Sequence, residues 1–228
     1  VFYNLLGEFL IEVRLTKIPT SLLTMDSNGD FICSYPKGIQ QLKVVLEKFS
    51  SEQKPVFSLV EIEPDYSNVY SRFAPGIVFS VTKENNIIWA VTNKYELNIN
   101  DSEGKLTRRI LKDYDSIEIT EEEKKNIIKN AAPRPGQKIP KNYPPLLPIF
   151  ISIDEKGRIF VGTYAKAEEG NGYYFDVFNL EGKYIAKVCL NSLLLRTSII
   201  WKKEKLYTIE EDEEGYQVIK RYKVTWKY

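Results

Sequence analysis

The residues that could carry chemistry in this chain are few, and most of them lie between positions 112 and 146. Asp113 and Asp115 flank Tyr114, so two carboxylates project from one short segment. Such a pair can transfer protons as a general acid and base, or bind a metal ion. The alternative is an ordinary solvated entry to a surface loop. We therefore treat Asp113 and Asp115 as candidate binding residues and assign no catalytic residue.

Arg134 and Tyr143 lie further along the same segment. Arginine and tyrosine are the side chains that most often dominate the energetics of interfaces. They are candidates to contact a ligand or a partner. The alternative is that they pack this segment onto the rest of the protein.

Two absences in the sequence narrow the possible chemistry. The chain contains no histidine, which excludes His-dependent triads and HExxH zinc sites within these residues. Residues 26–30, with the sequence DSNGD, resemble part of a calcium loop, but the required glycine is misplaced and no distal Glu completes it. This pentapeptide predicts a hairpin turn with a residue of positive φ. We expect no metal site and no cofactor.

Composition indicates an ordinary globular protein. The 32 Lys and Arg residues balance 31 Asp and Glu residues, so no electrostatic argument favours nucleic acid or an anionic membrane as a partner. No apolar run approaches the roughly 20 residues that span a bilayer. The chain opens on Val1, and we expect upstream sequence, with any targeting signal, to precede it. Cys33 and Cys189 fall in different repeats, so we expect two free, buried thiols.

A repeated pattern predicts the elements that must position these residues. An apolar run, a short polar turn and a second apolar run recur at 22–35, 77–92, 149–163 and 197–209. Further strand–turn–strand units follow at 95–111 and 173–190, with turns such as SEGK and LEGK that are typical of hairpins. A four-stranded antiparallel meander repeated in series is a propeller blade.

We therefore predict an all-β fold: one antiparallel β-propeller domain over residues 1–228, with about four and a half blades of an expected six. The expected parts are a partial blade at 1–15, blades at 19–62, 73–111, 147–190 and 194–228, and an insertion at 112–146. Trp89, Phe160 and Tyr207, each three residues after a turn position, are expected to occupy equivalent core sites. Strand reversal places the tight turns on one face and the long segments 63–72, 112–146 and 165–172 on the other.

The insertion itself has a helical and a proline-rich part. Thr120 and Glu123 form a capping-box pattern, and acidic residues precede lysines over 121–131. These features predict a short helix that Pro133 and Pro135 end. A long loop inside a compact domain is usually functional or a cover.

The motifs resemble a known group of proteins. The pattern D-x-x-G-x-I-aromatic-V at 154–161, followed by F-D-V-F-x-x-E-G-K-Y at 175–184, is similar to six-bladed β-propellers of the NHL and TolB-like type. The helix and proline segment that ends in Tyr143-Pro144-Pro145 looks like their bacterial envelope and lipoprotein-associated subgroup. The resemblance implies a six-fold ring and a location in the bacterial periplasm or cell envelope, and it transfers no catalytic set.

Two functions remain open at this point. The first is a non-enzymatic binding or scaffold propeller that presents the loops of one face to a protein or carbohydrate partner. The alternative is a metal-dependent propeller enzyme, lactonase-like or lyase-like, with its site at the central channel. The predicted inner strands begin with largely apolar residues and carry no carboxylate there, which favours the first.

Overall fold

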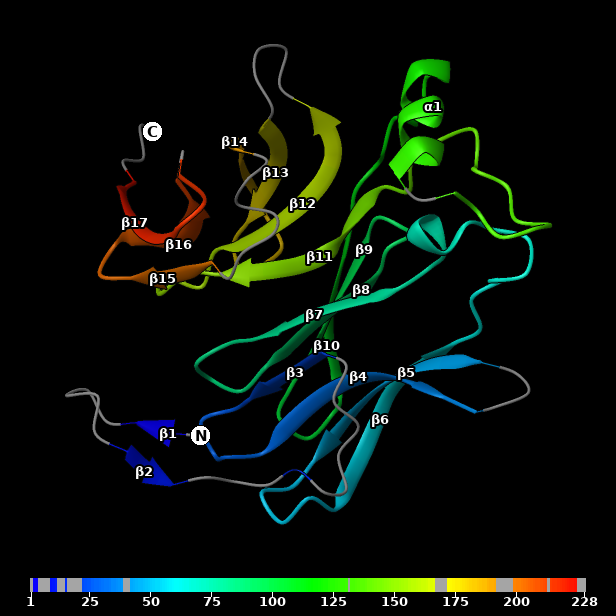
Figure 1. Cartoon of the computed structure of the whole chain (residues 1–228). Helices are drawn as coiled ribbons and strands as arrows, with labels where there is room; N and C mark the ends of the chain where they lie inside the picture. Colours follow the sequence, from blue (N-terminus) through cyan, green and yellow to red (C-terminus); the bar gives the residue numbers. More distant parts are fainter. Residues whose placement is uncertain are drawn as a thin grey trace.

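The computed structural model describes residues 2–3, 9–11, 15, 22–38, 42–130, 132–166, 172–191, 199–212 and 214–224. All pairing between the named strands is antiparallel, and four sheets follow one another in chain order as the blades of a β-propeller (Figure 1). Three have four strands, the last has three, and a short hairpin precedes them. The strands are β1 (Phe2–Tyr3), β2 (Phe9–Ile11), β3 (Leu22–Met25), β4 (Phe31–Lys37), β5 (Lys43–Phe49), β6 (Pro55–Ile62), β7 (Ile77–Val81), β8 (Ile87–Val91), β9 (Glu96–Asn100), β10 (Leu106–Leu111), β11 (Leu146–Ile153), β12 (Ile159–Lys166), β13 (Gly172–Phe178), β14 (Tyr184–Asn191), β15 (Ile200–Lys202), β16 (Lys205–Glu211) and β17 (Gln217–Lys223).

Most of the tight turns share one design. In each, the N–H of the first residue donates to the carbonyl of the fifth, and the N–H of the fourth donates to the carbonyl of the first. The fourth residue has a positive φ, which glycine adopts without strain. The turns of this type span 26–30, 50–54, 82–86, 101–105, 154–158, 179–183 and 212–216. The DSNGD segment is one of them, as its sequence predicts.

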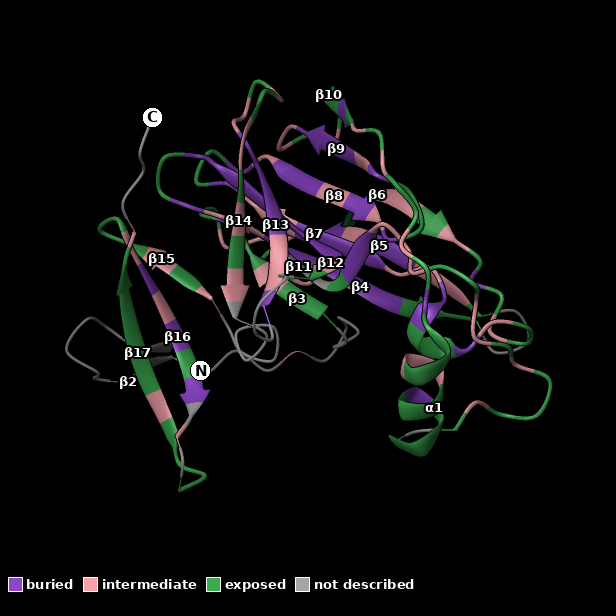
Figure 2. Cartoon of the chain, turned by 90° about the horizontal axis from the view of Figure 1, so that it is seen from above, coloured by how far each residue is buried: buried purple, intermediate pink, exposed green. Residues whose placement is uncertain are grey.

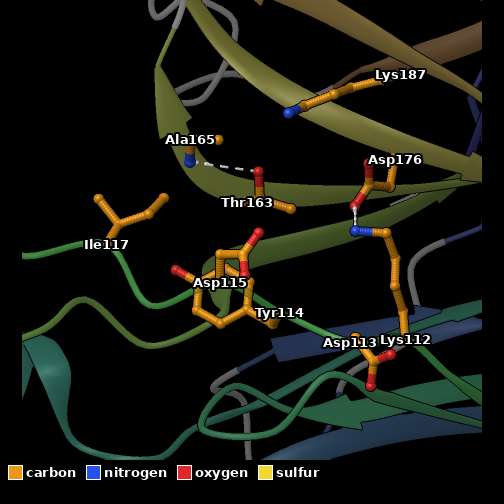
Figure 3. A pocket seen from close by; sticks show the side chains of 9 residues that line it. All are labelled: Lys112, Asp113, Tyr114, Asp115, Ile117, Thr163, Ala165, Asp176 and Lys187. Carbon is orange, nitrogen blue, oxygen red and sulfur yellow. Dashed lines mark hydrogen bonds and ion pairs between the residues drawn. The ribbon is translucent and has the colours of Figure 1, made fainter.

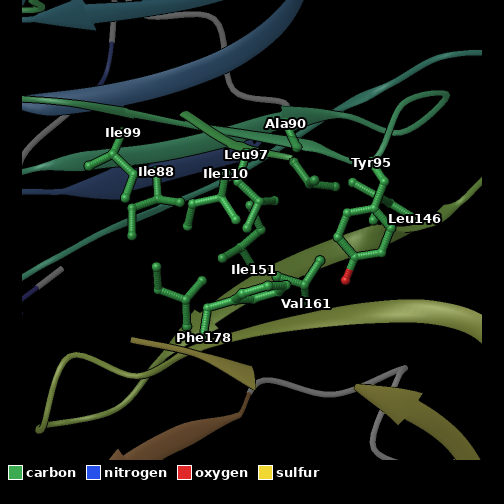
Figure 4. Close-up of a cluster of buried hydrophobic side chains, with 12 residues drawn as sticks. Ile88, Ala90, Tyr95, Leu97, Ile99, Ile110, Leu146, Ile151, Val161 and Phe178 are labelled. Atoms are coloured by element: carbon green, nitrogen blue, oxygen red, sulfur yellow. The ribbon is translucent and has the colours of Figure 1, made fainter. Parts of the chain in front are cut away.

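The core lies between neighbouring sheets. β7 runs beside both β3 and β11, and apolar clusters fill the space between successive sheets. The largest joins the β7–β10 sheet to the β11–β14 sheet, and it includes Ile88, Leu97, Ile151 and Val161 (Figure 4). The inner strands β8, β9, β12 and β13 of these sheets are largely buried, whereas β17 is mostly exposed (Figure 2).

One core prediction is wrong by a single residue. Phe160 is 2% exposed and faces the last sheet, but Trp89 is half-buried and faces the β3–β6 sheet. The residue equivalent to Phe160 is Ile88, because the positive-φ position of that turn is Asn85 and not Asn86. Tyr207 is also only half-buried. A slip of one residue along a strand moves a side chain to the opposite face of the sheet.

Neither cysteine forms a disulfide, as predicted. Cys33 is buried, but Cys189 is exposed, contrary to our expectation. Its strand, β14, is the outer strand of its sheet, so one edge of the strand has no neighbour in that sheet. Edge position explains the exposure.

Candidate functional site

The propeller has two unlike faces. We call the face with the turns at 26–30, 50–54, 82–86, 101–105 and 154–158 the turn face, and the opposite face, with the insertion of residues 112–146, the loop face. The predicted helix is α1 (Glu121–Asn130), and its capping box forms: the Glu123 amide donates to Thr120 Oγ1 (3.2 Å), and the Thr120 amide donates to Glu123 Oε2 (2.9 Å). A 3₁₀ turn, η1 (Ser71–Phe73), packs against α1.

Adjacent sheets are joined along the turn face. The side chain of Asn85 accepts hydrogen bonds from the amide and hydroxyl of Ser27, at 3.0 and 2.9 Å, across the first pair of sheets. Glu155 accepts from the backbone of Lys203 (2.5 Å) across the last pair. These bonds tie neighbouring sheets together at the turn face.

The carboxylates of the calcium-like turn form ion pairs with a lysine. Lys48, 4% exposed, places its ammonium 2.8 Å from Asp26 and 3.1 Å from Asp30. Burial alone would raise the pKa of Asp26, but the hydrogen bonds from Lys48 and from the turn amides lower it below the usual value. The carboxylates therefore serve a structural ion pair.

The loop face contains a pocket with a volume of about 260 Å³ (Figure 3). It lies between the first residues of the insertion and the β11–β14 sheet, beyond the end of the largest apolar cluster. Its lining combines charged side chains of both signs with apolar surface. The lining residues are Lys112, Asp113, Tyr114, Asp115, Ile117, Thr163, Ala165, Asp176 and Lys187.

Asp176 forms the most buried part of this lining. It is 2% exposed, and its carboxylate accepts hydrogen bonds from Tyr95 (2.6 Å) and Tyr184 (3.3 Å). Lys112 Nζ lies 3.2 Å from the same carboxylate and 5.0 Å from the centre of the Tyr95 ring. Burial and the bond to Asp176 both raise the pKa of Tyr95. This network holds Lys112 in a fixed position at the start of the insertion.

The other charged groups of the pocket are less constrained. Asp113 and Asp115 are exposed, and among the described residues neither has a hydrogen-bond or ion-pair partner. Lys187, opposite Asp176 in the β13–β14 pairing, places its ammonium 4.4 Å from the centre of the Tyr174 ring. In Figure 3, Lys187 and Asp115 approach the space beside Thr163 from opposite sides. The pocket thus offers hydrogen-bond acceptors on one wall and a donor on the other.

The remaining two candidates lie elsewhere. Tyr143 is half-buried and stacks on Tyr164, with ring centres 4.5 Å apart, while Phe73 meets it edge to face. Burial and the neighbouring Glu123 raise its pKa. Arg134 is exposed in a turn of the insertion, where its amide donates to the side chain of Gln137 (3.0 Å). Neither residue lines the pocket.

Sequence reasoning found only two of the charged pocket residues. It missed Lys112, which precedes Asp113 in the same segment, and also missed Thr163, Asp176 and Lys187, which come from β12, β13 and β14. A signal for one of them is present, because Asp176 is a carboxylate inside the otherwise apolar run YYFDVF. A charge within a strand buried on both sides requires partners, and such partners mark a site worth testing.

Fold and pocket together define a β-propeller with a mixed-charge pocket on its loop face. No family model matches the chain, and no curated protein matches it.

Among solved structures, the chain is similar to a protein of unknown function from Bacteroides caccae, with 11% identity and a TM-score of 0.42 over 87% of this chain and 66% of that one. It is also similar to a member of the duf4221 family from Bacteroides vulgatus, with 12% identity and a TM-score of 0.42 over 98% and 68% of the two chains. A streptogramin B lyase matches at 12% identity and a TM-score of 0.35 over 99% and 76%. The chain thus spans about two thirds of the length of the first two.

The described residues contain neither a candidate membrane span nor a candidate metal cluster. No helix in that part of the chain is both long and apolar enough to cross a bilayer. Within the same residues, no group of three or more His, Cys, Asp or Glu side chains is placed to hold a metal ion.

Proposed function

We propose that this protein is a non-enzymatic binding propeller that docks a protein partner on its loop face. The observation that carries the proposal is the contrast between the faces. Groups on the turn face bond to one another across the sheets, whereas the loop face carries the pocket and the insertion. Loops held on a rigid scaffold are the usual place for binding.

Exposed apolar side chains favour a protein as the partner over a carbohydrate. Leu111, at the start of the insertion, is 70% exposed, and Ile128 on α1 is 50% exposed. Apolar side chains beside a polar pocket are the composition of a protein interface with an apolar centre and a polar rim. Asp113, Asp115, Arg134 and Tyr143 belong to the same surface in this proposal.

Site-specific photo-crosslinking tests which face engages the partner. A photoreactive amino acid at position 111 or 128 would report on the loop face. The same group at position 52 or 83, both on exposed turns, is the matched control for the turn face. We expect protein adducts from positions 111 and 128 only.

The other outcomes are also informative. Adducts from 52 and 83 would place the interface on the wrong face and refute the proposal. A carbohydrate partner would give a different pair of results. Positions 111 and 128 would form no protein adduct, and substitutions on the loop face would abolish binding of a soluble glycan.

We also propose a six-bladed ring of the NHL or TolB-like type in the bacterial periplasm or cell envelope. The repeated five-residue turns and the motifs at 154–161 and 175–184 support this. Fractionation of the native host, with detection of the protein in the cytosol, would contradict the location.

A further inference from the structure

The charges of the pocket do not balance. Its lining contains two lysines and three aspartates, so the net charge of the lining is −1. One lysine and one aspartate, Lys112 and Asp176, are paired at 3.2 Å and bonded to buried tyrosines. That pair is a fixed part of the wall, and the imbalance resides in the other three groups.

Asp113 and Asp115 supply the excess negative charge. They lie two positions apart in the sequence and both line the pocket, and among the residues that the structure describes no cation pairs with either. Lys187 lies against the Tyr174 ring, and the negative face of that ring attracts its ammonium. Outside the Lys112–Asp176 pair, two carboxylates therefore face one cation, Lys187, in the pocket lining.

The size of the cavity limits the ligand. A volume of about 260 Å³ is smaller than the roughly 300–1,000 Å³ typical of sites that enclose a whole small molecule. It suits one long side chain that extends from a larger partner. The walls beside the carboxylates, Tyr114 and Ile117, offer apolar surface to the methylene stem of such a side chain.

We propose that the pocket binds a basic side chain of the protein partner, an arginine in preference to a lysine. A guanidinium donates several N–H groups in a planar fork and can bond to carboxylates in pairs, which a lysine ammonium cannot do. This inference rests on the proposed function and specifies the chemistry of the partner at one point of the interface.

Binding of a small probe tests the inference directly. The probe is the peptide acetyl-Gly-Arg-Gly-amide, and the neutral isostere with citrulline in place of arginine is its control. Binding is followed by the chemical shifts of backbone amides at 112–117 and 163–165. We expect the arginine peptide to bind at least about fivefold more tightly than the citrulline peptide, with weaker binding as salt rises.

Two charge variants should change the affinity for the arginine peptide in opposite directions. Asp115→Asn should lower the affinity for the arginine peptide about two- to fivefold, which is the range for loss of a solvent-exposed charge pair. Lys187→Gln should raise the affinity for the arginine peptide by a similar factor, because the substitution removes a positive charge that repels the guanidinium. Glu52→Gln and Lys83→Gln make the same charge changes on the turn face and should leave binding unchanged.

Several results would overturn the inference. They are equal binding of the two peptides, no binding of either, or a loss of affinity in Lys187→Gln, which an anionic or sugar ligand would produce. If one of these results were found but the loop face still crosslinked to a protein, the proposed function would stand. Only the inference that the pocket binds a basic side chain would be rejected. Arginine-peptide binding without loop-face adducts would reject the proposed function and keep the pocket chemistry.

Discussion

Removal of the Phe160 ring should weaken the attachment of the last sheet to the propeller. Phe160 is 2% exposed and stacks on Trp201 of β15, with ring centres 4.5 Å apart and planes 22° apart. The Trp201 indole also donates to Ser152 Oγ (2.9 Å) on β11. Phe160→Ala deletes a buried ring at this junction, and such deletions cost about 3–5 kcal/mol. Since small domains are stable by about 5–15 kcal/mol, the loss is a large fraction of the total.

Urea unfolding, followed by tryptophan fluorescence and by circular dichroism, measures this loss. Trp201 reports on the junction itself, so partial detachment of the last sheet would shift fluorescence before circular dichroism. Phe160→Leu is the control, because it keeps most of the buried volume and should cost about 1.5 kcal/mol or less. A loss below about 1 kcal/mol for Phe160→Ala would show that the ring is not packed between sheets and would refute the assignment.

Two further predictions concern the turn face. Gly104 and Gly29 both have positive φ, but a Cβ on Gly104 would lie 3.0 Å from the Phe57 ring, while the nearest atom to one on Gly29 is 3.9 Å away. Gly29→Ala should therefore cost about 1 kcal/mol in backbone strain and Gly104→Ala about 1 kcal/mol more for the clash; equal shifts in thermal denaturation would contradict this. Asp26→Asn removes the carboxylate closest to the buried Lys48 and should cost about 1–3 kcal/mol, because Asp30 remains 3.1 Å from the ammonium. Because the folded-state pKa of Asp26 is lowered, its contribution is complete above the unfolded value of 3.8 and is lost as pH falls through the folded value. The wild type should lose more stability than the variant between about pH 4 and pH 2, and parallel acid-denaturation curves would be the contrary result.

Local signals in the sequence predicted local structure well. The capping box between Thr120 and Glu123 forms because both partners lie within one helical turn. The five-residue turns were visible because a positive φ selects Gly or Asn at one position. The same signal misplaced Trp89, since residues 85 and 86 are both Asn and either could hold the positive φ. Because the turn signal does not distinguish Asn85 from Asn86, it cannot predict which face of the sheet each side chain of the following strand occupies.

The pocket was predictable only in part, because long-range packing assembles it. Asp113 and Asp115 were identified from their spacing, but Asp176 and Lys187 come from strands more than 60 positions further along the chain. Their proximity follows from the packing of the β7–β10 sheet on the β11–β14 sheet. No spacing rule relates residues that meet only through two sheets, so tertiary structure was required to bring these charges together.

The roles of the two kinds of carboxylate in the pocket can be separated by experiment. Asp176→Asn removes the counter-charge of Lys112 at 3.2 Å. Because Lys112 is 34% exposed, solvent screens part of the loss, and we expect about 2 kcal/mol of destabilisation in urea. Asp115→Asn breaks no contact within the described part of the chain and should change the free energy of unfolding by less than about 0.5 kcal/mol. The same substitution should nevertheless lower the affinity for the arginine peptide. Equal destabilisation by the two variants would mean that Asp115 is also a structural group, and that the pocket has no free carboxylate to offer a partner.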